Sequence, residues 1–449
     1  MKRRVAWLLI LCALSTWGEL PDSTRQRLDQ MTAATRTAFE TPSVSVAVTQ
    51  SGNIVYARAF GNADTSTRYA IGSISKQFTV AALLLAQEQG TLSLADPVSK
   101  YFPEFTRAGE IAIKQLLSHT SGYEDYAPQD YMIPEWAKAA SPEGLLEVWA
   151  KKPLNFDPGT RWQYSNTNYV LAGKIFEKAS GQQFLPYLKQ RIFEPLGMTS
   201  AGDCTIKTAA DTTAYTRFAL GPARPALREG PGWYFAAGEL CMTASDLARW
   251  DAAFLGKRIL SAKSYQEFVR EVKLRSGAAT HYALGLRLGE MAGTPMLSHS
   301  GEVSGFLAMN SVFPKKQLGI AVLSNEDNVE LVGTVMRQIA SALLEPQSEK
   351  SQRNAEVRAI LEDLQHGRID RERFTAHANA YFVPPAIEDY RASLAPLGKL
   401  VALTLENEQA RGGMTHMTYR AHFERNTVAL NIYVTPGGKY EQFLVEEVF

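Results

Sequence analysis

An excess of charge of one sign, a basic stripe and long apolar runs are all missing from this sequence of 449 residues. Its 47 lysines and arginines offset 46 aspartates and glutamates, so the formal net charge is +1 at pH 7. Because binding to nucleic acid or to an anionic membrane surface needs a basic patch, this balance argues against both partners. After the N-terminal segment, no stretch has the apolar length that a transmembrane helix needs.

Histidine and cysteine are also scarce. The seven histidines are scattered, and neither His-Glu-x-x-His nor another metal-ligand spacing occurs, so we expect no metal and no cofactor. The three cysteines are Cys12, in the predicted leader, Cys204 and Cys241. The last two could pair in an oxidising compartment, but sequence cannot show that they lie close together. We therefore expect two separate buried thiols that behave as small hydrophobic side chains.

The N-terminal segment is typical of a secretory signal peptide. Three basic residues at 2–4 precede an apolar run at 5–14, and small residues up to Gly18 offer cleavage points. The run is too short to span a bilayer. We predict a signal peptide at 1–18 and a mature protein that is exported to the periplasm or the cell exterior.

The pattern of region 22–345 predicts a single α+β domain. It opens with alternating residues at 42–50, a Ser-Gly-Asn turn and a return strand at 54–60. Helical stretches and loops rich in Gly and Pro follow. Strand patterns return at 295–301, 305–314 and 318–325. Strands at both ends with helices between them predict one antiparallel sheet that packs beside an all-helical region.

A polar stretch at 346–354 reads as a linker to a small α+β accessory domain at 355–449. In this domain two or three short helices precede four strand-like stretches. One face of the second strand carries Thr415, Met417, Tyr419, Ala421 and Phe423. Polar residues alternate with them, as in a half-buried antiparallel strand. The sequence leaves open whether this domain packs beside the active site, forms a partner or dimer surface, or does neither.

The stretch at 71–90, IGSISKQFTVAALLLAQEQG, places serines and one lysine at the start of an apolar helix that ends at Gly90. One interpretation is that Ser73 caps the helix. The other is chemical: residues three apart share a helical face, so Lys76 Nζ can reach Ser73 Oγ. Burial lowers the pKa of a lysine, which lets it take or relay the serine proton and makes Ser73 a nucleophile.

Two further motifs support the interpretation that Ser73 is a nucleophile. Tyr164-Ser165-Asn166 follows a turn, and His299-Ser300-Gly301 lies on a predicted strand edge. Ser-x-x-Lys, Tyr-x-Asn and Lys/His-x-Gly in this order resemble the penicillin-recognising serine hydrolases. These include class C β-lactamases, D-Ala-D-Ala carboxypeptidases, D-amino-acid peptidases and carboxylesterases. The resemblance extends over roughly 22–345, and includes the stretches 111–122, 156–173, 193–198 and 236–250.

The resemblance implies catalytic roles for three residues. Ser73 would attack a carbonyl and become acylated, and Lys76 would share the proton transfers with a partly ionised Tyr164 that acts as general base. The backbone N–H groups of Ser73 and Glu302 would form the oxyanion hole. Water would then cleave the acyl-enzyme.

The resemblance also implies a set of substrate-binding residues: Asn166, His299, Ser300, Gly301 and Glu302. Asn166 would hydrogen bond to the substrate amide, and Gly301 would let the substrate backbone approach the strand edge. His299 replaces the lysine that is common in the third motif, and a histidine with the ordinary pKa of about 6.5 is mostly neutral at pH 7.5. This lowers the expectation of an efficient β-lactamase. His119 belongs to a stretch that resembles a structural loop of the family, so it is not counted as catalytic.

These observations predict an exported serine hydrolase that acts through an acyl-enzyme on a small-molecule or peptide substrate. Candidate substrates are β-lactams, D-amino-acid peptides or amides, and small esters. The absence of Gly-x-Ser-x-Gly argues against an α/β-hydrolase. Two alternatives stay open: a penicillin-binding sensor that is acylated slowly, and a structural paralogue that keeps the fold without catalysis.

Overall fold

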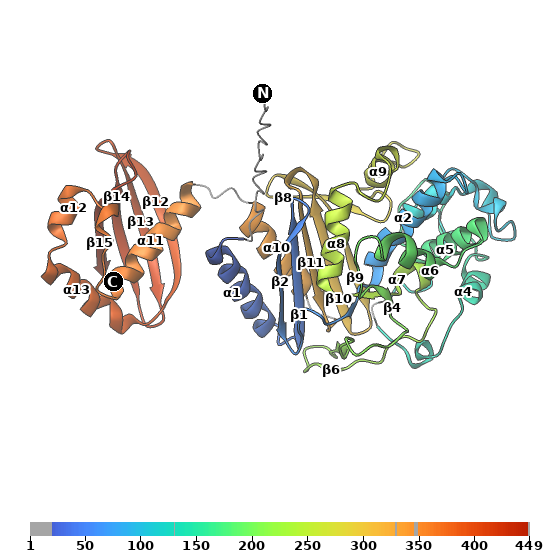
Figure 1. Cartoon of the computed structure of the whole chain (residues 1–449), viewed down its shortest axis with the longest axis horizontal. Coiled ribbons are helices and arrows are strands. Elements are labelled where there is room, and N and C mark those ends of the chain that lie inside the picture. Colours follow the sequence, from blue (N-terminus) through green and yellow to red (C-terminus); the bar gives the residue numbers. More distant parts are fainter. Residues whose placement is uncertain (1–19, 130, 328–329, 345–348, 448–449) are drawn as a thin grey trace, which may run out of the picture. The chain divides into compact units, whose positions relative to one another are not determined.

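The computed structural model describes residues 20–129, 131–327, 330–344 and 349–447. The predicted signal peptide at 1–18 lies outside these residues. The chain forms two compact units that divide between Leu344 and Glu345 (Figure 1). Each unit has its own buried core, and the first contains all the predicted site residues.

A six-stranded antiparallel sheet forms the centre of the first unit, with the strand order β2-β1-β11-β10-β9-β8. The strands are β1 (Ser43–Gln50), β2 (Asn53–Gly61), β8 (Arg287–Met291), β9 (Thr294–Val303), β10 (Phe306–Phe313) and β11 (Leu318–Ser324). Strand β1 pairs with β2 on one side and with β11 on the other. The early hairpin and the late strands therefore share one sheet, as predicted.

Helices cover both faces of this sheet. Helices α1 (Asp22–Ala38) and α10 (Leu331–Leu344) pack on one face, and α8 (Ala244–Leu255) packs on the other (Figure 1). Strand β1 is therefore buried on both sides: its valines join the core beneath α1 and α10, whereas Ala47 faces the opposite core. This burial explains why β1 carries small or apolar residues at nearly every position.

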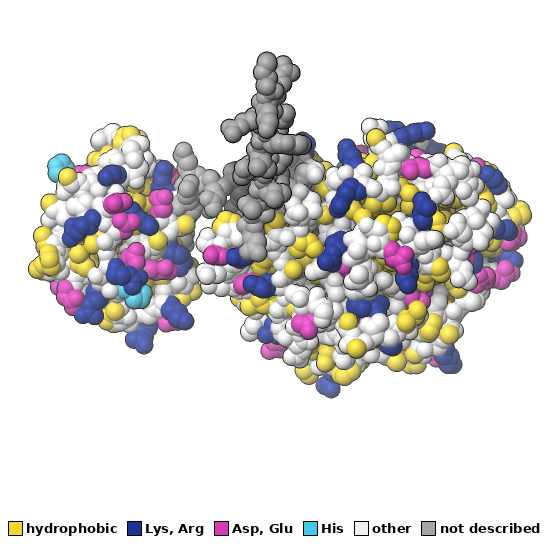
Figure 2. All heavy atoms as spheres, in the orientation of Figure 1, with side chains coloured by type: hydrophobic (Ala, Val, Ile, Leu, Met, Phe, Trp, Pro, Cys, Tyr) yellow, Lys and Arg dark blue, Asp and Glu magenta, His cyan; other side chains and the backbone are white. Residues whose placement is uncertain are grey.

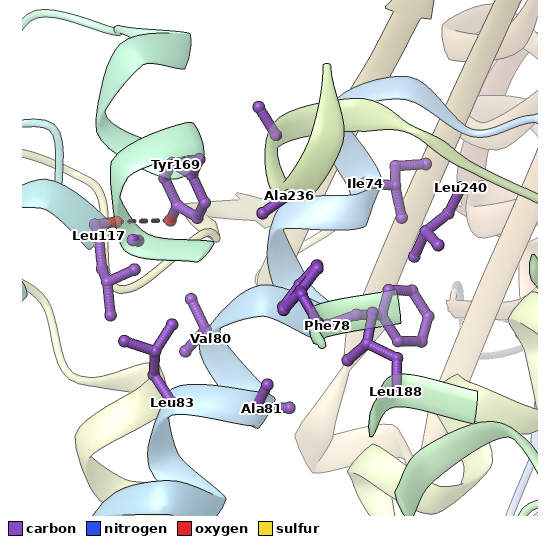
Figure 3. Close-up of a cluster of buried hydrophobic side chains, with 14 of the residues drawn as sticks. Ile74, Phe78, Val80, Ala81, Leu83, Leu117, Tyr169, Leu188, Ala236 and Leu240 are labelled. Carbon is purple, nitrogen blue, oxygen red and sulfur yellow. Dashed lines mark hydrogen bonds between the residues drawn. The ribbon is translucent and has the colours of Figure 1, made fainter. Parts of the chain in front are cut away.

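Helix α2 (Ser75–Glu88) runs through the helical region of the first unit and is buried along most of its length. Figure 3 shows its side chains Phe78, Val80 and Leu83 among apolar residues from several other elements. The predicted helix is therefore present, but it starts later than Ser73, which lies in the 3₁₀ turn η1 (Gly72–Ile74) and makes no capping hydrogen bond. The capping interpretation is wrong. Gly90 has a φ of 72°, which fits the predicted helix end.

A buried polar network fixes α2 against the sheet. Asn310 Nδ2, on β10, donates to both carboxylate oxygens of Asp251 at 2.8 Å. Gln77 Nε2, on α2, donates to Asn310 Oδ1 at 3.0 Å, and Trp250 Nε1 donates to Gln77 Oε1 at 2.8 Å. Burial raises the pKa of Asp251 to about 8. Because Gln77 follows Lys76 directly, this network sets the rotation of α2 at the lysine.

Cys204 and Cys241 form a disulfide with their Cα atoms 5.0 Å apart, so the prediction of two separate thiols is wrong. The reason is a long-range strand pairing. In a small sheet, β4 (Gly202–Asp203) and β3 (Tyr69–Ala70) both pair with β7 (Leu240–Met242). This pairing brings together cysteines that are 37 residues apart in the sequence.

We expect the Cys204→Ala/Cys241→Ala variant to lose about 3 kcal/mol in its free energy of unfolding, because the disulfide closes a long loop in the unfolded chain. Urea unfolding of the first unit under non-reducing conditions measures this loss. Wild-type protein that has been reduced and alkylated should unfold at the same urea concentration as the variant. A variant as stable as the oxidised wild type would contradict a stabilising role.

The second unit places helices on one face of a four-stranded antiparallel sheet, with the order β12-β13-β14-β15. Its elements are α11 (Glu349–Gln365), α12 (Ala376–Tyr381), α13 (Pro384–Leu394), β12 (Leu400–Arg411), β13 (Met414–Phe423), β14 (Thr427–Val434) and β15 (Tyr440–Glu447). In β13, Met417, Tyr419, Ala421 and Phe423 are buried, so the predicted inner face is present.

The linker predicted at 346–354 is partly wrong, because α11 begins at Glu349. The Glu, Lys, Gln and Arg residues of this stretch are good helix formers, so a polar composition does not exclude a helix.

The described surface carries both signs of charge. On the face shown in Figure 2, basic and acidic side chains are interspersed over each unit. Within the described ranges, no helix is both long enough and apolar enough to cross a membrane. Among the same residues, no group of three or more His, Cys, Asp or Glu side chains is arranged to hold a metal ion.

Candidate active site

Ser73 is held in a turn that presses directly on strand β9. Gly72 has a φ of 49°, and a Cβ at this position would lie 2.6 Å from the backbone nitrogen of Glu302. A Cβ on Gly301 would lie only 1.8 Å from the carbonyl oxygen of Ile71. Both positions therefore require glycine. The sequence predicts that Gly301 makes room for substrate; in the structure, the Ile71 carbonyl oxygen takes that room.

Lys76 is fully buried and points at the Ser73 hydroxyl. Its Nζ donates to Ser73 Oγ at 2.9 Å, to Asn166 Oδ1 at 2.8 Å and to the carbonyl oxygen of Ala237 at 2.8 Å. Burial lowers the pKa of Lys76 to about 7, although the nearby Asp125 carboxylate acts in the opposite direction. Burial therefore favours the neutral form of the lysine, which can accept a proton.

Tyr164 approaches Ser73 from the other side. Its hydroxyl donates to Ser73 Oγ at 2.6 Å, and Lys76 Nζ lies 4.9 Å from the centre of its ring. Burial raises the pKa of Tyr164 above its ordinary value, and the Asp125 charge adds to this rise. Burial therefore disfavours the partly ionised tyrosine that the sequence predicts, whereas it favours the neutral form of Lys76.

Asn166, the first residue of α5 (Asn166–Ser180), is fixed by Asp125. The Asn166 backbone N–H donates to Asp125 Oδ1 at 3.0 Å, and its side-chain Nδ2 donates to Asp125 Oδ2 at 3.4 Å. Burial raises the pKa of Asp125, and the hydrogen bond from the Asn166 backbone opposes that rise. Sequence reasoning missed Asp125, because a single loop aspartate 41 residues before Asn166 belongs to no motif.

His299 supplies no positive charge to the site. Its Nδ1 lies 2.5 Å from the carbonyl oxygen of Ser300. Because a carbonyl only accepts, Nδ1 carries the proton, and Nε2 accepts from the Tyr282 hydroxyl at 3.0 Å. Burial lowers the pKa of His299 to about 3, and the charge of Lys76 contributes to this shift. The third motif is thus neutral throughout the physiological pH range.

The exposed part of strand β9 borders the nucleophile. Strand β8 pairs with β9 only as far as Ser298, whereas β10 pairs with it up to Val303. The stretch 299–303 therefore has a strand on one side and the turn with Ser73 on the other. Ser300 and Glu302 are exposed on this stretch, and His299 and Gly301 are buried.

His119 supports Tyr164 from behind. The two rings lie 4.4 Å apart, and His119 Nδ1 accepts from the backbone N–H of Ser165 at 3.2 Å. Burial lowers the pKa of His119 well below its ordinary value, so the ring is neutral. Its contact with the site passes through Tyr164, which gives it a positioning role.

Arg287 brings a positive charge that sequence reasoning missed, because a lone arginine on a strand forms no motif. It lies on β8, is exposed, and places its guanidinium 5.6 Å from the centre of the Trp162 ring. Its charge acts to lower the pKa values of Tyr164 and His299. An exposed cation therefore lies near a motif whose histidine is neutral.

The fold and the arrangement of Ser73, Lys76 and Tyr164 define a serine hydrolase of the β-lactamase type. The family model described as Beta-lactamase matches residues 28–343. The chain belongs to this family, which confirms the predicted family, fold class and enzyme class.

The chain is similar to relatives with different names, of which two curated proteins and one solved structure are examples. A protein named putative penicillin-binding protein PbpX, from Bacillus subtilis, is 28% identical over 306 residues, which cover 66% of this chain and 74% of that protein. A D-aminopeptidase from Brucella anthropi is 29% identical over 287 residues, which cover 60% of this chain and 53% of that enzyme. The match thus spans about half the length of the D-aminopeptidase. A D-stereospecific amidohydrolase from Streptomyces sp. superimposes with a TM-score of 0.64 at 25% identity, covering 73% of this chain and 100% of that chain.

Proposed function

We propose that this protein hydrolyses amides or short peptides of D-amino acids through an acyl-enzyme on Ser73. The observation that carries the proposal is the double contact at the hydroxyl: Lys76 Nζ lies at 2.9 Å and Tyr164 OH at 2.6 Å from Ser73 Oγ. The substrate class is supported by two proteins to which the chain is similar, named a D-aminopeptidase and a D-stereospecific amidohydrolase. The neutral His299 fits a substrate that does not depend on a cation in the third motif.

The proton transfers follow from the protonation states. Neutral Lys76 takes the proton of Ser73 as Oγ attacks the carbonyl carbon, and negative charge develops on the carbonyl oxygen. The backbone N–H groups of Ser73 and Glu302 would stabilise that oxyanion. Tyr164 then gives its proton to the leaving amine and regains one from Lys76, so the amine departs neutral. Water cleaves the acyl-enzyme by the reverse relay, which restores the serine.

Substrate binding would use the exposed edge of β9 and the start of α5. Backbone groups of Ser300 and Glu302 would pair with the substrate backbone. Asn166 Oδ1 already accepts from Lys76, so its Nδ2 would be the group that donates to the substrate amide. These roles keep Asn166, Ser300 and Glu302 from the predicted substrate-binding set, whereas Gly301 takes a packing role and His299 supplies no positive charge.

The test is a panel of D- and L-aminoacyl 4-nitroanilides, a chromogenic cephalosporin and an activated ester. We expect kcat/KM to be at least tenfold higher for the D-aminoacyl amides than for their L counterparts, as about 1.4 kcal/mol of preference requires. A preference for the L series, or faster cleavage of the cephalosporin than of any amide, would overturn the substrate class. A stable adduct without turnover would point to the slowly acylated sensor instead.

We also propose that the protein is exported. The basic and apolar pattern at 1–18 supports export, and so does the disulfide between Cys204 and Cys241, since disulfides persist in oxidising compartments. The mass of the N-terminal peptide from protein recovered outside the cytoplasm checks this. An uncleaved N-terminus in the cytoplasmic fraction would contradict it. A partner or dimer surface on the second unit stays a prediction.

A further inference from the structure

A pocket of about 170 Å³ opens beside the turn that carries Ser73. Its lining includes Ala70, three residues before Ser73, together with Gly238 and Val303. A Cβ on Gly238 would lie 3.6 Å from the backbone carbon of Gly72, so this lining residue packs against the residue that precedes Ser73. The charged residues that line it are Lys207, Arg228, Glu229 and Glu239. Because Gly238 packs on the turn that carries Ser73, the pocket lies where it could receive the acyl part of a substrate.

The wall of the pocket that carries Arg228 is held in place by the segment at 136–140. The Gly230 backbone N–H donates to the carbonyl oxygen of Trp136 at 2.8 Å, and Trp233 Nε1 donates to that of Lys138 at 2.8 Å. The rings of Trp136 and Trp233 stack with their centres 5.1 Å apart. The pocket is therefore formed before a ligand arrives, so little ordering is needed on binding.

Arg228 lies in this wall and forms no ion pair there, although the charges of Glu229 and Asp211 act on its guanidinium. Among the described residues it makes no hydrogen bond and no ion pair, and its Nε is buried without an acceptor. Its guanidinium lies 4.9 Å from the centre of the Phe306 ring. A largely buried guanidinium with unused donors is unfavourable until an acceptor pairs with it. The fork of donors matches a carboxylate, which it can bind through two parallel hydrogen bonds.

The two acidic residues of the pocket are held by other groups. Glu229 Oε1 accepts from the Tyr234 hydroxyl at 3.0 Å and from the Ser304 backbone N–H at 2.9 Å. Glu239 Oε1 accepts from the Gly232 backbone N–H at 2.9 Å. Neither carboxylate forms an ion pair with Arg228 among the described residues, although the charge of Glu229 acts on the guanidinium. The guanidinium thus remains available for a ligand, and Lys207 adds a second positive charge to the lining.

We propose that this pocket binds a carboxylate on the acyl part of the substrate, with Arg228 as the partner of that carboxylate. The inference rests on the proposed function and adds to it an acidic side group on the D-amino acid that forms the acyl-enzyme and is released by water. Glu239 also lines the pocket and would repel such a carboxylate, so Arg228 should favour an acidic substrate and Glu239 should disfavour it.

The test compares D-glutamyl and D-glutaminyl 4-nitroanilide, which have the same shape and differ in one charge. We expect wild type to have a higher kcat/KM for the D-glutamyl substrate, mainly through KM. Arg228→Gln should reduce the ratio of the two values about tenfold, because a charge-assisted bidentate contact is lost. Glu239→Gln should increase the ratio. Arg224→Gln, which removes an exposed arginine of β6 (Arg224–Pro225) outside the pocket, should leave the ratio as in wild type.

A ratio that Arg228→Gln leaves unchanged would overturn the proposal, because a merely structural role would lower both values together. If neither nitroanilide is cleaved, the proposed function has failed, and the pocket is then tested by binding alone. Calorimetry with D-glutamyl amide and Ser73→Ala protein should give a Kd that the additional change Arg228→Gln raises about tenfold. An equal Kd in both proteins would overturn the carboxylate site.

Discussion

Replacing Ser73 with alanine is expected to lower kcat/KM for every cleaved substrate by about 10⁵-fold, the scale that loss of a nucleophile has in serine hydrolases. Ser73 Oγ receives hydrogen bonds from both Lys76 Nζ and Tyr164 OH, and within the described part of the chain no other hydroxyl does so. Without the nucleophile, no second group can form the acyl-enzyme. Single-turnover and steady-state rates with the best substrate of the panel measure the loss.

Ser75→Ala is the matched control for this experiment. Ser75 lies two residues from the nucleophile, and its hydroxyl accepts a hydrogen bond from the Leu240 backbone N–H at 3.3 Å, away from the reacting group. We expect this variant to keep most of the activity. A folded Ser73→Ala variant that retained a hundredth or more of the wild-type rate would contradict the role of Ser73 as nucleophile.

Removing the amine of Lys76 is expected to have the second largest effect. Lys76→Met keeps the length of the side chain but cannot accept a proton, so kcat should fall by about 10³-fold. The same argument predicts the pH dependence of wild type. Below pH 7 Lys76 is protonated and cannot take the serine proton, so kcat/KM rises as the pH increases through about 7, far below the ordinary lysine value of 10.5.

Asp125→Asn supplies the control for this pH profile. The Asp125 carboxylate acts to raise the pKa of Lys76, so removing its charge should move the rise in kcat/KM to lower pH. An asparagine at this position can still accept the backbone hydrogen bond of Asn166. If the profile of wild type were flat between pH 5 and 9, or if Asp125→Asn moved the rise to higher pH, Lys76 would not be the base.

Much of the fold and of the candidate site could be predicted from local sequence patterns. The three-residue spacing of Ser73 and Lys76 on a helical path was enough to bring Nζ within 2.9 Å of Oγ. The alternation in β1 and β13 predicted strands whose inner residues are buried. These features depend on residues that are close in sequence, where backbone geometry alone decides which side chains meet.

Features that depend on contacts between distant segments could not be predicted from the sequence. The pairing of Cys204 with Cys241 follows from the register of β4 and β7, and no feature of the local sequence specifies that register. The raised pKa of Tyr164 follows from burial that several distant segments produce together. Asp125 and Arg228 belong to loops, and their meaning depends on which groups the fold places beside them.

The most direct test of the acyl-enzyme is the mass of the intact protein after mixing with a penicillin or with an activated ester. The account predicts that intact wild-type protein gains the mass of one acyl group and that Ser73→Ala gains none. After proteolysis of the wild type, the added mass should be found on the peptide that contains Ser73. Comparing the lifetime of the adduct with the turnover rate then separates a hydrolase from a slowly acylated sensor. An adduct of equal yield on Ser73→Ala, or on a peptide that lacks Ser73, would contradict the central claim.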